Sequence, residues 1–227
     1  MDAGGDDFDE ESTTMYRALS ARLLHLSMDR PEVAYAAKEL CRHFAHPTKL
    51  GVEGLKRAVR LLVGLPRLVW HFPFTNVDGV LKVYVDTVFG GCQHTRRLTS
   101  GGIALRGTHA IKHRSLTQTT IALLFRGSRT WWDMPRRFEI LSDATAAMGI
   151  CRRRGLGKLR HLHVADLWVE DRLRRGDFQL TKVLGSDNRA DLLTKHVSRD
   201  IMLRHMETIG IRAEVGRAKS APTLQHS

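Results

Sequence analysis

Two aspartates that follow apolar strand patterns are the first sign of chemistry in this 227-residue sequence. Asp86 closes the alternating run Leu-Lys-Val-Tyr-Val-Asp, and Asp143 closes the run Phe-Glu-Ile-Leu-Ser-Asp. In an open α/β sheet the strand ends face a crevice where ligands collect, so acids from neighbouring strands can share a divalent cation. A third acid, Asp191, lies just beyond a later strand pattern.

Three carboxylates brought to one place predict metal-dependent phosphodiester chemistry. Mg²⁺ and Mn²⁺ prefer oxygen ligands, and a two-metal nuclease uses a carboxylate cluster to hold its ions about 4 Å apart. Such a site needs no nucleophilic side chain. For any single aspartate, a turn or helix N-cap role is roughly twice as common as a ligand role. Three acids together weaken that structural alternative without removing it.

The chain is strongly basic, which favours a polyanionic partner. It has 36 Lys and Arg against 24 Asp and Glu, a net charge of +12, and six of the acids lie in the first eleven residues. Lys and Arg supply most sequence-independent affinity for nucleic acid, although a merely soluble basic surface has the same composition. A dense basic cluster after Asp143 is expected to bind the phosphates or sugar edges of an A-like duplex, the alternative being a solvated loop. Its members are Arg152, Arg153, Arg154, Lys158 and Arg160.

Other groups give weaker signals. Three cysteines lie about fifty residues apart without pairing, which favours a reducing intracellular compartment, cytoplasmic or nuclear, and no zinc site. No run approaches 18 consecutive apolar residues, so no membrane partner is expected. His161 and His163 are two residues apart and would not share a helix face. Base stacking is one role for Trp131 and Trp132, but filling a core is the more common one.

The elements before Asp86 are predicted to be helical. Residues 1–12 are acidic and glycine-rich, and we expect them to form a disordered lead-in. A helical part is then predicted over residues 13–75. Apolar spacing and proline positions predict its helices at 14–26, between Asp29 and Pro47, and at 52–62, with a short extended run at 68–72.

After the turn-rich stretch Asn76-Val-Asp-Gly79 the apolar period becomes strand-like, so we place a boundary there. A mixed α/β domain is predicted over residues 80–211, since parallel strand pairings need helical crossovers. Residues 212–227 are expected to be a flexible tail. The strands are predicted at 81–86, 101–105, 108–112, 138–143 and 178–183, and the helices at 144–153, 162–173 and 198–209.

Several blocks, in this order, resemble the C-terminal part of a copia-type retrotransposon Pol polyprotein. The stretches Tyr16 to Leu40 and Leu55 to Leu68 resemble helices that close the reverse transcriptase part, without its catalytic aspartates. Later blocks resemble the ribonuclease H domain, which implies a ribonuclease H-like mixed five-stranded sheet with flanking helices. These blocks are Tyr84-Val-Asp86 with Gly91 to Gly101, Ser115 to Leu123, Ser142-Asp-Ala-Thr-Ala-Ala-Met-Gly149 and Asn188-Arg-Ala-Asp-Leu-Leu-Thr-Lys195.

The resemblance implies that Asp86, Asp143 and Asp191 are three of four catalytic carboxylates that bind Mg²⁺ or Mn²⁺ and cleave RNA in RNA/DNA hybrids. The fourth, a glutamate that begins a helix after the third strand, is missing, because residues 124–137 contain no glutamate. A deletion, frameshift or wrong splice junction is our hypothesis for the lost helix. We therefore expect weak or absent nuclease activity. The alternative is a non-catalytic nucleic-acid-binding protein or a decayed transposon remnant, and the remainder of a Pol polyprotein is a further expected partner.

Overall fold

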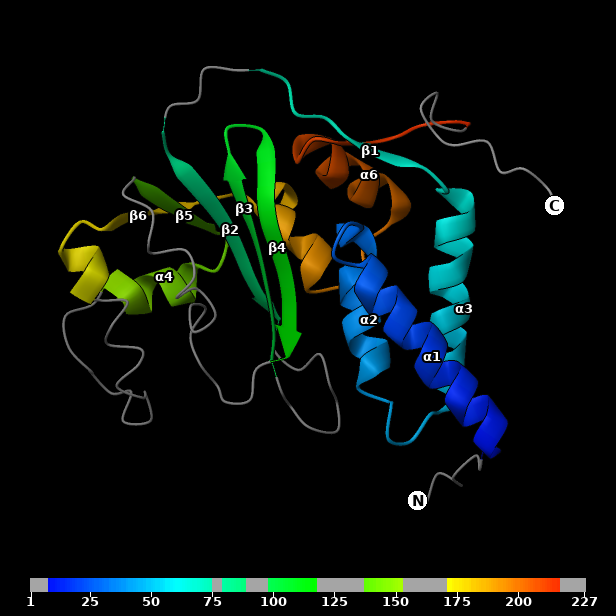
Figure 1. The fold of residues 1–227 in the computed structure, drawn as a ribbon. Helices are drawn as coiled ribbons and strands as arrows, with labels where there is room; N and C mark the ends of the chain where they lie inside the picture. The colour runs from blue at the N-terminus through cyan, green and yellow to red at the C-terminus, as the bar shows by residue number, and fades with distance from the viewer. Residues whose placement is uncertain (1–7, 75–78, 89–97, 118–136, 153–170, 217–227) are drawn as a thin grey trace.

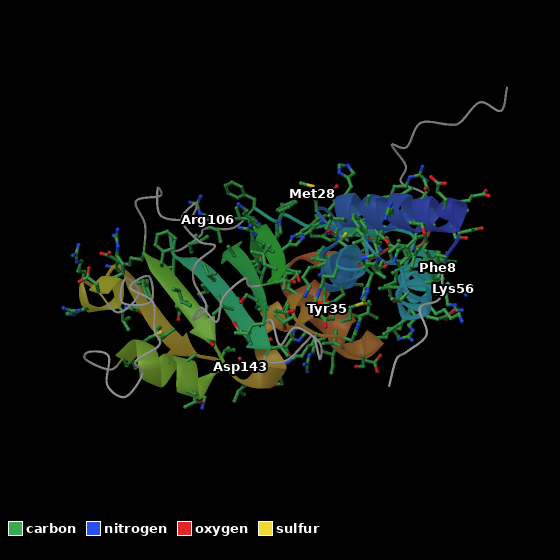
Figure 2. All side chains as sticks on the ribbon, turned by 90° about the horizontal axis from the view of Figure 1, so that it is seen from below. Phe8, Met28, Tyr35, Lys56, Arg106 and Asp143 are labelled. Carbon is green, nitrogen blue, oxygen red and sulfur yellow. The ribbon has the colours of Figure 1, made fainter. Side chains whose placement is uncertain are left out.

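The computed structural model describes residues 8–74, 79–88, 98–117, 137–152 and 171–216 (Figure 1). They form a mixed five-stranded sheet, a second sheet of two short strands, and helices packed around both. In this described part of the chain, no helix is long and apolar enough to cross a membrane. Figure 2 shows the molecule from below, with Phe8 and Lys56 at the outer end of the helices and Asp143 at the end of a strand of the main sheet.

The helical segment, residues 10–64, contains α1 (Glu10–Leu26), η1 (Pro31–Val33), α2 (Ala34–Cys41) and α3 (Lys49–Gly64). The side chain of Asp9 caps α1 by accepting a hydrogen bond from the Ser12 amide, and two glutamates in the first turn favour the positive end of the helix. The predicted disordered lead-in over residues 1–12 was therefore wrong for its last three residues, which are helical. Residues 1–7 lie outside the described part.

The three helices pack closely around Tyr16. The Tyr16 hydroxyl donates a hydrogen bond to the Leu40 carbonyl oxygen at 2.9 Å. A Cβ atom on Gly51 would lie 2.8 Å from the same hydroxyl oxygen, so this approach of α3 to α1 requires glycine. The helices thereby enclose a small core of their own, made of Tyr16, Leu23, Val33, Ala37, Leu40, Leu55 and Ala58.

The main sheet has the strand order β4-β3-β2-β5-β6. The hairpins β2–β3 and β3–β4 are antiparallel, whereas β2–β5 and β5–β6 are parallel. Gly107, with a φ of 61°, makes the predicted turn between β3 and β4. The predicted mixed five-stranded α/β fold with flanking helices is thus confirmed. Its strands are β2 (Leu81–Val88), β3 (Thr99–Arg106), β4 (His109–Thr117), β5 (Phe138–Ser142) and β6 (Phe178–Lys182).

Successive side chains along each strand point to opposite faces of this sheet, and each face has its own apolar cluster. On β2, Tyr84 packs with one cluster, which includes residues of η4 (Arg189–Leu193) and α6 (Arg199–Thr208). Val85 packs with the other cluster, which includes Cys151 of α4 (Thr145–Arg152). Side chains at i and i+2 share a face, so Asp86 belongs to the face of Tyr84. The sheet therefore presents Asp86 to η4.

A second, two-stranded sheet joins the segment that follows α3 to the residues that follow α6. β1 (Leu68–Trp70) pairs antiparallel with β7 (Ile211–Ala213). The flexible tail predicted for residues 212–227 was therefore wrong at its first two residues. Ile211 is buried opposite Trp70, and the backbone of the residues that follow continues the ladder. Residues 217–227 lie outside the described part.

The helical segment and the main sheet share a core. Ala34 of α2, and Leu65 directly after α3, pack in the same apolar cluster as the strand residues Ile103 and Leu105. A polar contact also crosses the junction, because the Lys38 ammonium donates to the Thr99 hydroxyl at 2.6 Å. Figure 1 shows α1, α2 and α3 together on one side of the sheet, with α4 at the other side. This packing places α2 beside the sheet edge that carries the predicted site.

Candidate metal centre

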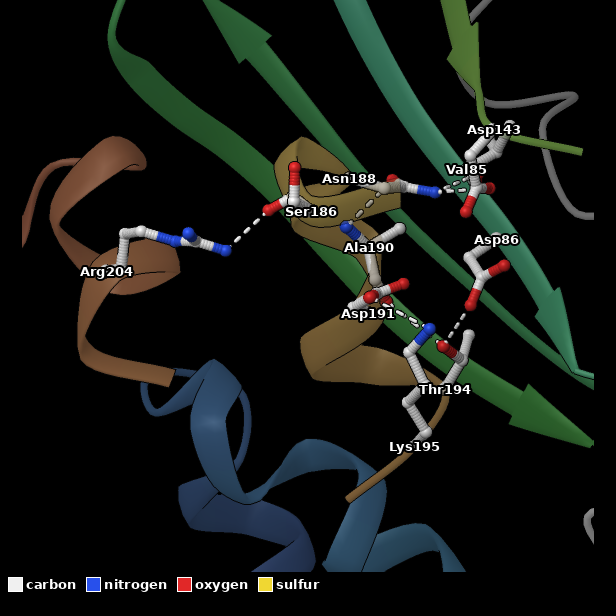
Figure 3. A network of polar contacts seen from close by, with 10 residues as sticks. All are labelled: Val85, Asp86, Asp143, Ser186, Asn188, Ala190, Asp191, Thr194, Lys195 and Arg204. Atoms are coloured by element: carbon white, nitrogen blue, oxygen red, sulfur yellow. Dashed lines mark hydrogen bonds and ion pairs between the residues drawn. The ribbon is translucent and has the colours of Figure 1, made fainter. Parts of the chain in front are cut away.

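The three predicted aspartates lie together. Asp86 is near the end of β2, Asp143 directly follows the parallel neighbour β5, and Asp191 is on η4 (Figure 3). One carboxylate oxygen from each residue lies within 4.8 Å of the other two. The parallel pairing of β2 and β5 explains the first two positions, because parallel strands end at the same edge. Strand pairing does not explain the position of Asp191, because this residue lies on η4 and not on a strand.

Asn188 ties η4 to the sheet. Its side-chain oxygen accepts from the Ala190 amide at 3.2 Å and so caps η4. Its side-chain amide donates to the Val85 carbonyl at 3.1 Å and to Asp143 Oδ1 at 3.0 Å. Asn188 is completely buried, so its bond to Val85 is protected from water, whereas its partner Asp143 is partly exposed. No role was predicted for Asn188 from the sequence, although an asparagine before a short helical turn is a common N-cap signal.

Gly101 allows η4 to approach the sheet. It lies opposite Asp86 in the β2–β3 register. A Cβ atom at Gly101 would lie 2.6 Å from Thr194 Cγ2 and 2.8 Å from Leu193 Cβ, both closer than atoms can approach. The Ser115 hydroxyl also donates to the Leu193 carbonyl, which binds the end of η4 to β4.

The carboxylates have unequal surroundings. Asp86 is 7% exposed and accepts a hydrogen bond from the Thr194 hydroxyl. Asp191 is also 7% exposed, and its Oδ2 lies 2.8 Å from the Lys195 ammonium. Burial raises the pKa of Asp191 above its ordinary value, and Asp86 and Asp143 raise it further, while Lys195 opposes the change. The other oxygen, Asp191 Oδ1, is buried without a hydrogen-bond partner among the described residues.

These features fit a hard divalent cation. The donors are all carboxylate oxygens, which suit Mg²⁺ and Mn²⁺. Oxygen ligands of one ion with bonds of about 2.1 Å lie about 3.0 Å apart when adjacent and about 4.2 Å apart when opposite, so oxygens within 4.8 Å of one another would move closer together on binding a single ion. A buried carboxylate oxygen without a partner is costly, and a bound cation would satisfy it. Asp86, Asp143 and Asp191 are therefore the residues able to hold such an ion.

The predicted basic cluster can be placed at one residue only. Arg152 ends α4 and is exposed, and its guanidinium donates to the Leu180 carbonyl of β6 at 2.8 Å. Arg153, Arg154, Lys158 and Arg160 lie outside the described residues, as do residues 118–136, which include most of the stretch 124–137 that lacks the fourth carboxylate. The nucleic-acid-binding role of this cluster stays a prediction.

Comparisons with known proteins identify relatives over most of the chain. No protein-family model matches the sequence. The retrovirus-related Pol polyprotein from transposon RE1 of Arabidopsis thaliana is 24% identical over 221 residues, covering 87% of this chain and 15% of that protein. The corresponding polyprotein from transposon TNT 1-94 of Nicotiana tabacum is 21% identical over 216 residues, covering 86% of this chain and 16% of that protein.

A structural comparison finds the N-terminal ribonuclease H domain of Rv2228c from Mycobacterium tuberculosis, solved as a fusion with maltose-binding protein. It is 14% identical, with a TM-score of 0.36, and the match covers 59% of this chain and 99% of that chain. The sequence comparisons confirm the predicted relationship to copia-type Pol polyproteins. The chain is accordingly a homologue of retrovirus-related transposon Pol polyproteins that spans about 15% of the length of these relatives.

Proposed function

We propose that this chain is a ribonuclease H-like part of a retrotransposon Pol polyprotein, which binds RNA/DNA hybrid at a divalent-cation site. Asp86, Asp143 and Asp191 hold the cation in this proposal. The observation that supports it best is the convergence of three carboxylate oxygens within 4.8 Å of one another. One of these residues, Asp191, has a second oxygen that is buried and has no hydrogen-bond partner in the part of the chain that the structure describes. Homology to transposon Pol polyproteins and the mixed five-stranded sheet agree with it.

The site would act on the phosphodiester backbone of the RNA strand. Bound Mg²⁺ or Mn²⁺ supplies Lewis-acid stabilisation of charge that develops on phosphate oxygens. The three aspartates hold and orient the cation, while Asn188 and Thr194 fix the orientation of Asp143 and Asp86 through hydrogen bonds. RNA is distinguished from DNA by its 2′-hydroxyl.

We further propose that hydrolysis by this chain is weak or absent. The fourth carboxylate of the ribonuclease H pattern is a glutamate, and residues 124–137, where it would lie, contain none. Metal-dependent phosphoryl chemistry tolerates little misplacement of its ions. A site with three carboxylates is therefore expected to bind a cation and yet to turn over slowly.

Metal binding and cleavage are tested separately on the full chain. In calorimetric titration with Mn²⁺, Asp143→Asn is expected to weaken binding by about tenfold or more. Asp187→Asn is the matched control, because Asp187 is an exposed aspartate on η3 (Gly185–Asp187) outside the carboxylate cluster. Equal affinities of the two variants and the unsubstituted chain would refute the metal site.

A labelled RNA/DNA hybrid, incubated with Mg²⁺ or Mn²⁺, tests the chemistry. If the unsubstituted chain cleaves the hybrid and Asp143→Asn abolishes this cleavage, the proposed weak or absent hydrolysis is contradicted. The second candidate function is a non-catalytic nucleic-acid-binding protein, which the net charge of +12 favours. Salt-sensitive binding of hybrid without cleavage supports that function, and no salt-sensitive binding at all identifies a decayed remnant.

A further inference from the structure

A groove separates the helical segment from the chain that follows η4. Its volume is about 600 Å³, and its walls come from α2, α3 and the stretch 192–202. Lys195 lies in this wall and is also the residue whose ammonium contacts Asp191. The groove therefore starts beside the candidate metal centre and extends onto the helical segment.

The charges in the groove favour an anion. Both of its acids are already compensated, because Glu32 pairs with Arg30, and Glu39 pairs with Arg42 at 2.9 Å and with Lys38. The groove also has basic side chains. Arg57 on α3 is exposed, as is Lys195, whose ammonium also pairs with Asp191, and two histidines, His43 and His196, lie with them along the walls.

Aromatic contacts join the two walls. The rings of Tyr35 on α2 and of His196 meet edge to face, with centroids 4.9 Å apart. The Lys38 ammonium lies 4.8 Å from the centre of the Tyr35 ring and is anchored to β3 through Thr99. Flat apolar surfaces next to cations are the features with which proteins bind unpaired bases and their phosphates.

We infer that this groove binds a single strand of nucleic acid that continues from the candidate metal centre. A cleft of this volume is in the range that accommodates a small molecule, so it admits about one or two nucleotides and excludes a duplex. The inference rests on the proposed function, because the strand is taken to leave a hybrid bound at the aspartates. The inference gives the helical segment a contact with the substrate, although none of the three aspartates lies in that segment.

The test compares blunt RNA/DNA hybrid with hybrid that has a single-stranded extension of about six nucleotides. Extensions of either polarity are used, and the affinity of the full chain is measured by fluorescence anisotropy with Ca²⁺ present. An extension of one polarity is expected to tighten binding about fivefold. Arg57→Glu should remove most of this gain, because it reverses a groove charge. Arg60→Glu is the matched control, since Arg60 is an exposed residue on the same helix outside the groove, and it should retain the gain.

His196→Ala is a second variant, which removes the exposed ring in contact with Tyr35 and should reduce the gain in part. An extension without effect, or equal losses in Arg57→Glu and Arg60→Glu, would overturn the inference. If an apolar fluorescent dye occupies the groove while the extension has no effect, the partner is apolar and the inference also fails.

Blunt hybrid separates this inference from the proposed function. If the chain binds blunt hybrid, and neither an extension nor Arg57→Glu changes the affinity, the proposed function is supported. Only the inference that the groove binds a single strand is then refuted. If blunt hybrid does not bind, but an isolated single strand binds in a manner that depends on Arg57, the groove is supported and the hybrid proposal fails.

Discussion

Lys195 places a positive charge against the three carboxylates of the candidate metal centre. Its ammonium lies 2.8 Å from Asp191 Oδ2, so it competes with a cation for the same oxygen. The contact is partly exposed, since 44% of the Lys195 side chain is accessible to solvent. Exposed ion pairs contribute about 0.2–1 kcal/mol, which limits how strongly this lysine can oppose the metal.

Replacing Lys195 is therefore expected to strengthen metal binding. Lys195→Met removes the competing charge and keeps an unbranched side chain, and we expect Mn²⁺ to bind about two- to fivefold more tightly in calorimetric titration. Lys182→Met on β6 is the control, because Lys182 is exposed and its strand contributes no aspartate to the cluster. Weaker binding in Lys195→Met would show instead that the lysine mainly positions Asp191.

At the level of elements, the sequence predicted the strand-borne part of the site better than the part on η4. Asp86 and Asp143 end local patterns of alternating residues, and parallel pairing of β2 and β5 brings them together. The close approach of η4 to the sheet depends instead on Gly101, which belongs to the sequence-distant strand β3. It also depends on the hydrogen bonds of the buried Asn188 side chain. Pairings between residues so distant leave no periodic signal.

The pairing of β1 with β7 was not predicted, because it too joins residues that are distant in sequence. β7 has three residues, which are too few for an alternating pattern, and its partner β1 is distant in sequence, between α3 and β2. The prediction of the first helix was also wrong at its start, because an acidic composition predicts disorder whereas the helix begins at Glu10. Asp9 and the glutamates after it instead form a capped first turn.

The glycine at position 101 gives an element-scale prediction. In Gly101→Ala the new methyl group must displace Thr194 and Leu193, which moves η4 and Asp191 away from Asp86. We expect a loss of about 1–3 kcal/mol in the free energy of unfolding and roughly tenfold weaker Mn²⁺ binding. Urea unfolding and calorimetric titration measure the two effects.

The neighbouring glycine on the same strand is the control. A Cβ at Gly102 would have the Tyr84 carbonyl oxygen as its nearest neighbour, at an ordinary 3.7 Å. Gly102→Ala should therefore leave metal affinity close to that of the unsubstituted chain. If both alanine variants bind Mn²⁺ equally well, the approach of η4 does not depend on Gly101.

At the scale of the whole molecule, one continuous core connects parts that the sequence assigned to different domains. Residues from the helical segment, the main sheet, η4, α6 and β7 pack in a single apolar cluster. Helix α6 contributes Met202 and Met206 to this cluster, and both side chains are buried there. A group on the buried face of α6 should therefore affect the stability of the entire structure.

His205 is such a group, and it should make folding sensitive to acid. It is 2% exposed, and its Nε2 is buried without a hydrogen-bond partner among the described residues. Burial lowers the pKa of His205 below its ordinary value, Arg204 and Arg189 lower it further, and Asp187 opposes them. Between the ordinary pKa and this lower value the unfolded chain binds the extra proton, so the folded state loses stability as the pH falls through that interval.

His205→Leu should weaken this pH dependence, because leucine has a similar volume and no proton to gain. Urea unfolding between pH 8 and pH 5 should show a smaller loss of stability in His205→Leu than in the unsubstituted chain. His25→Leu, at an exposed histidine of α1, should show the unaltered loss. Parallel stability profiles of the His205→Leu variant and the unsubstituted chain would mean that His205 gains its proton equally easily in the folded and unfolded states. Acid sensitivity would then have to come from other groups, and the buried face of α6 would not couple protonation to the shared core.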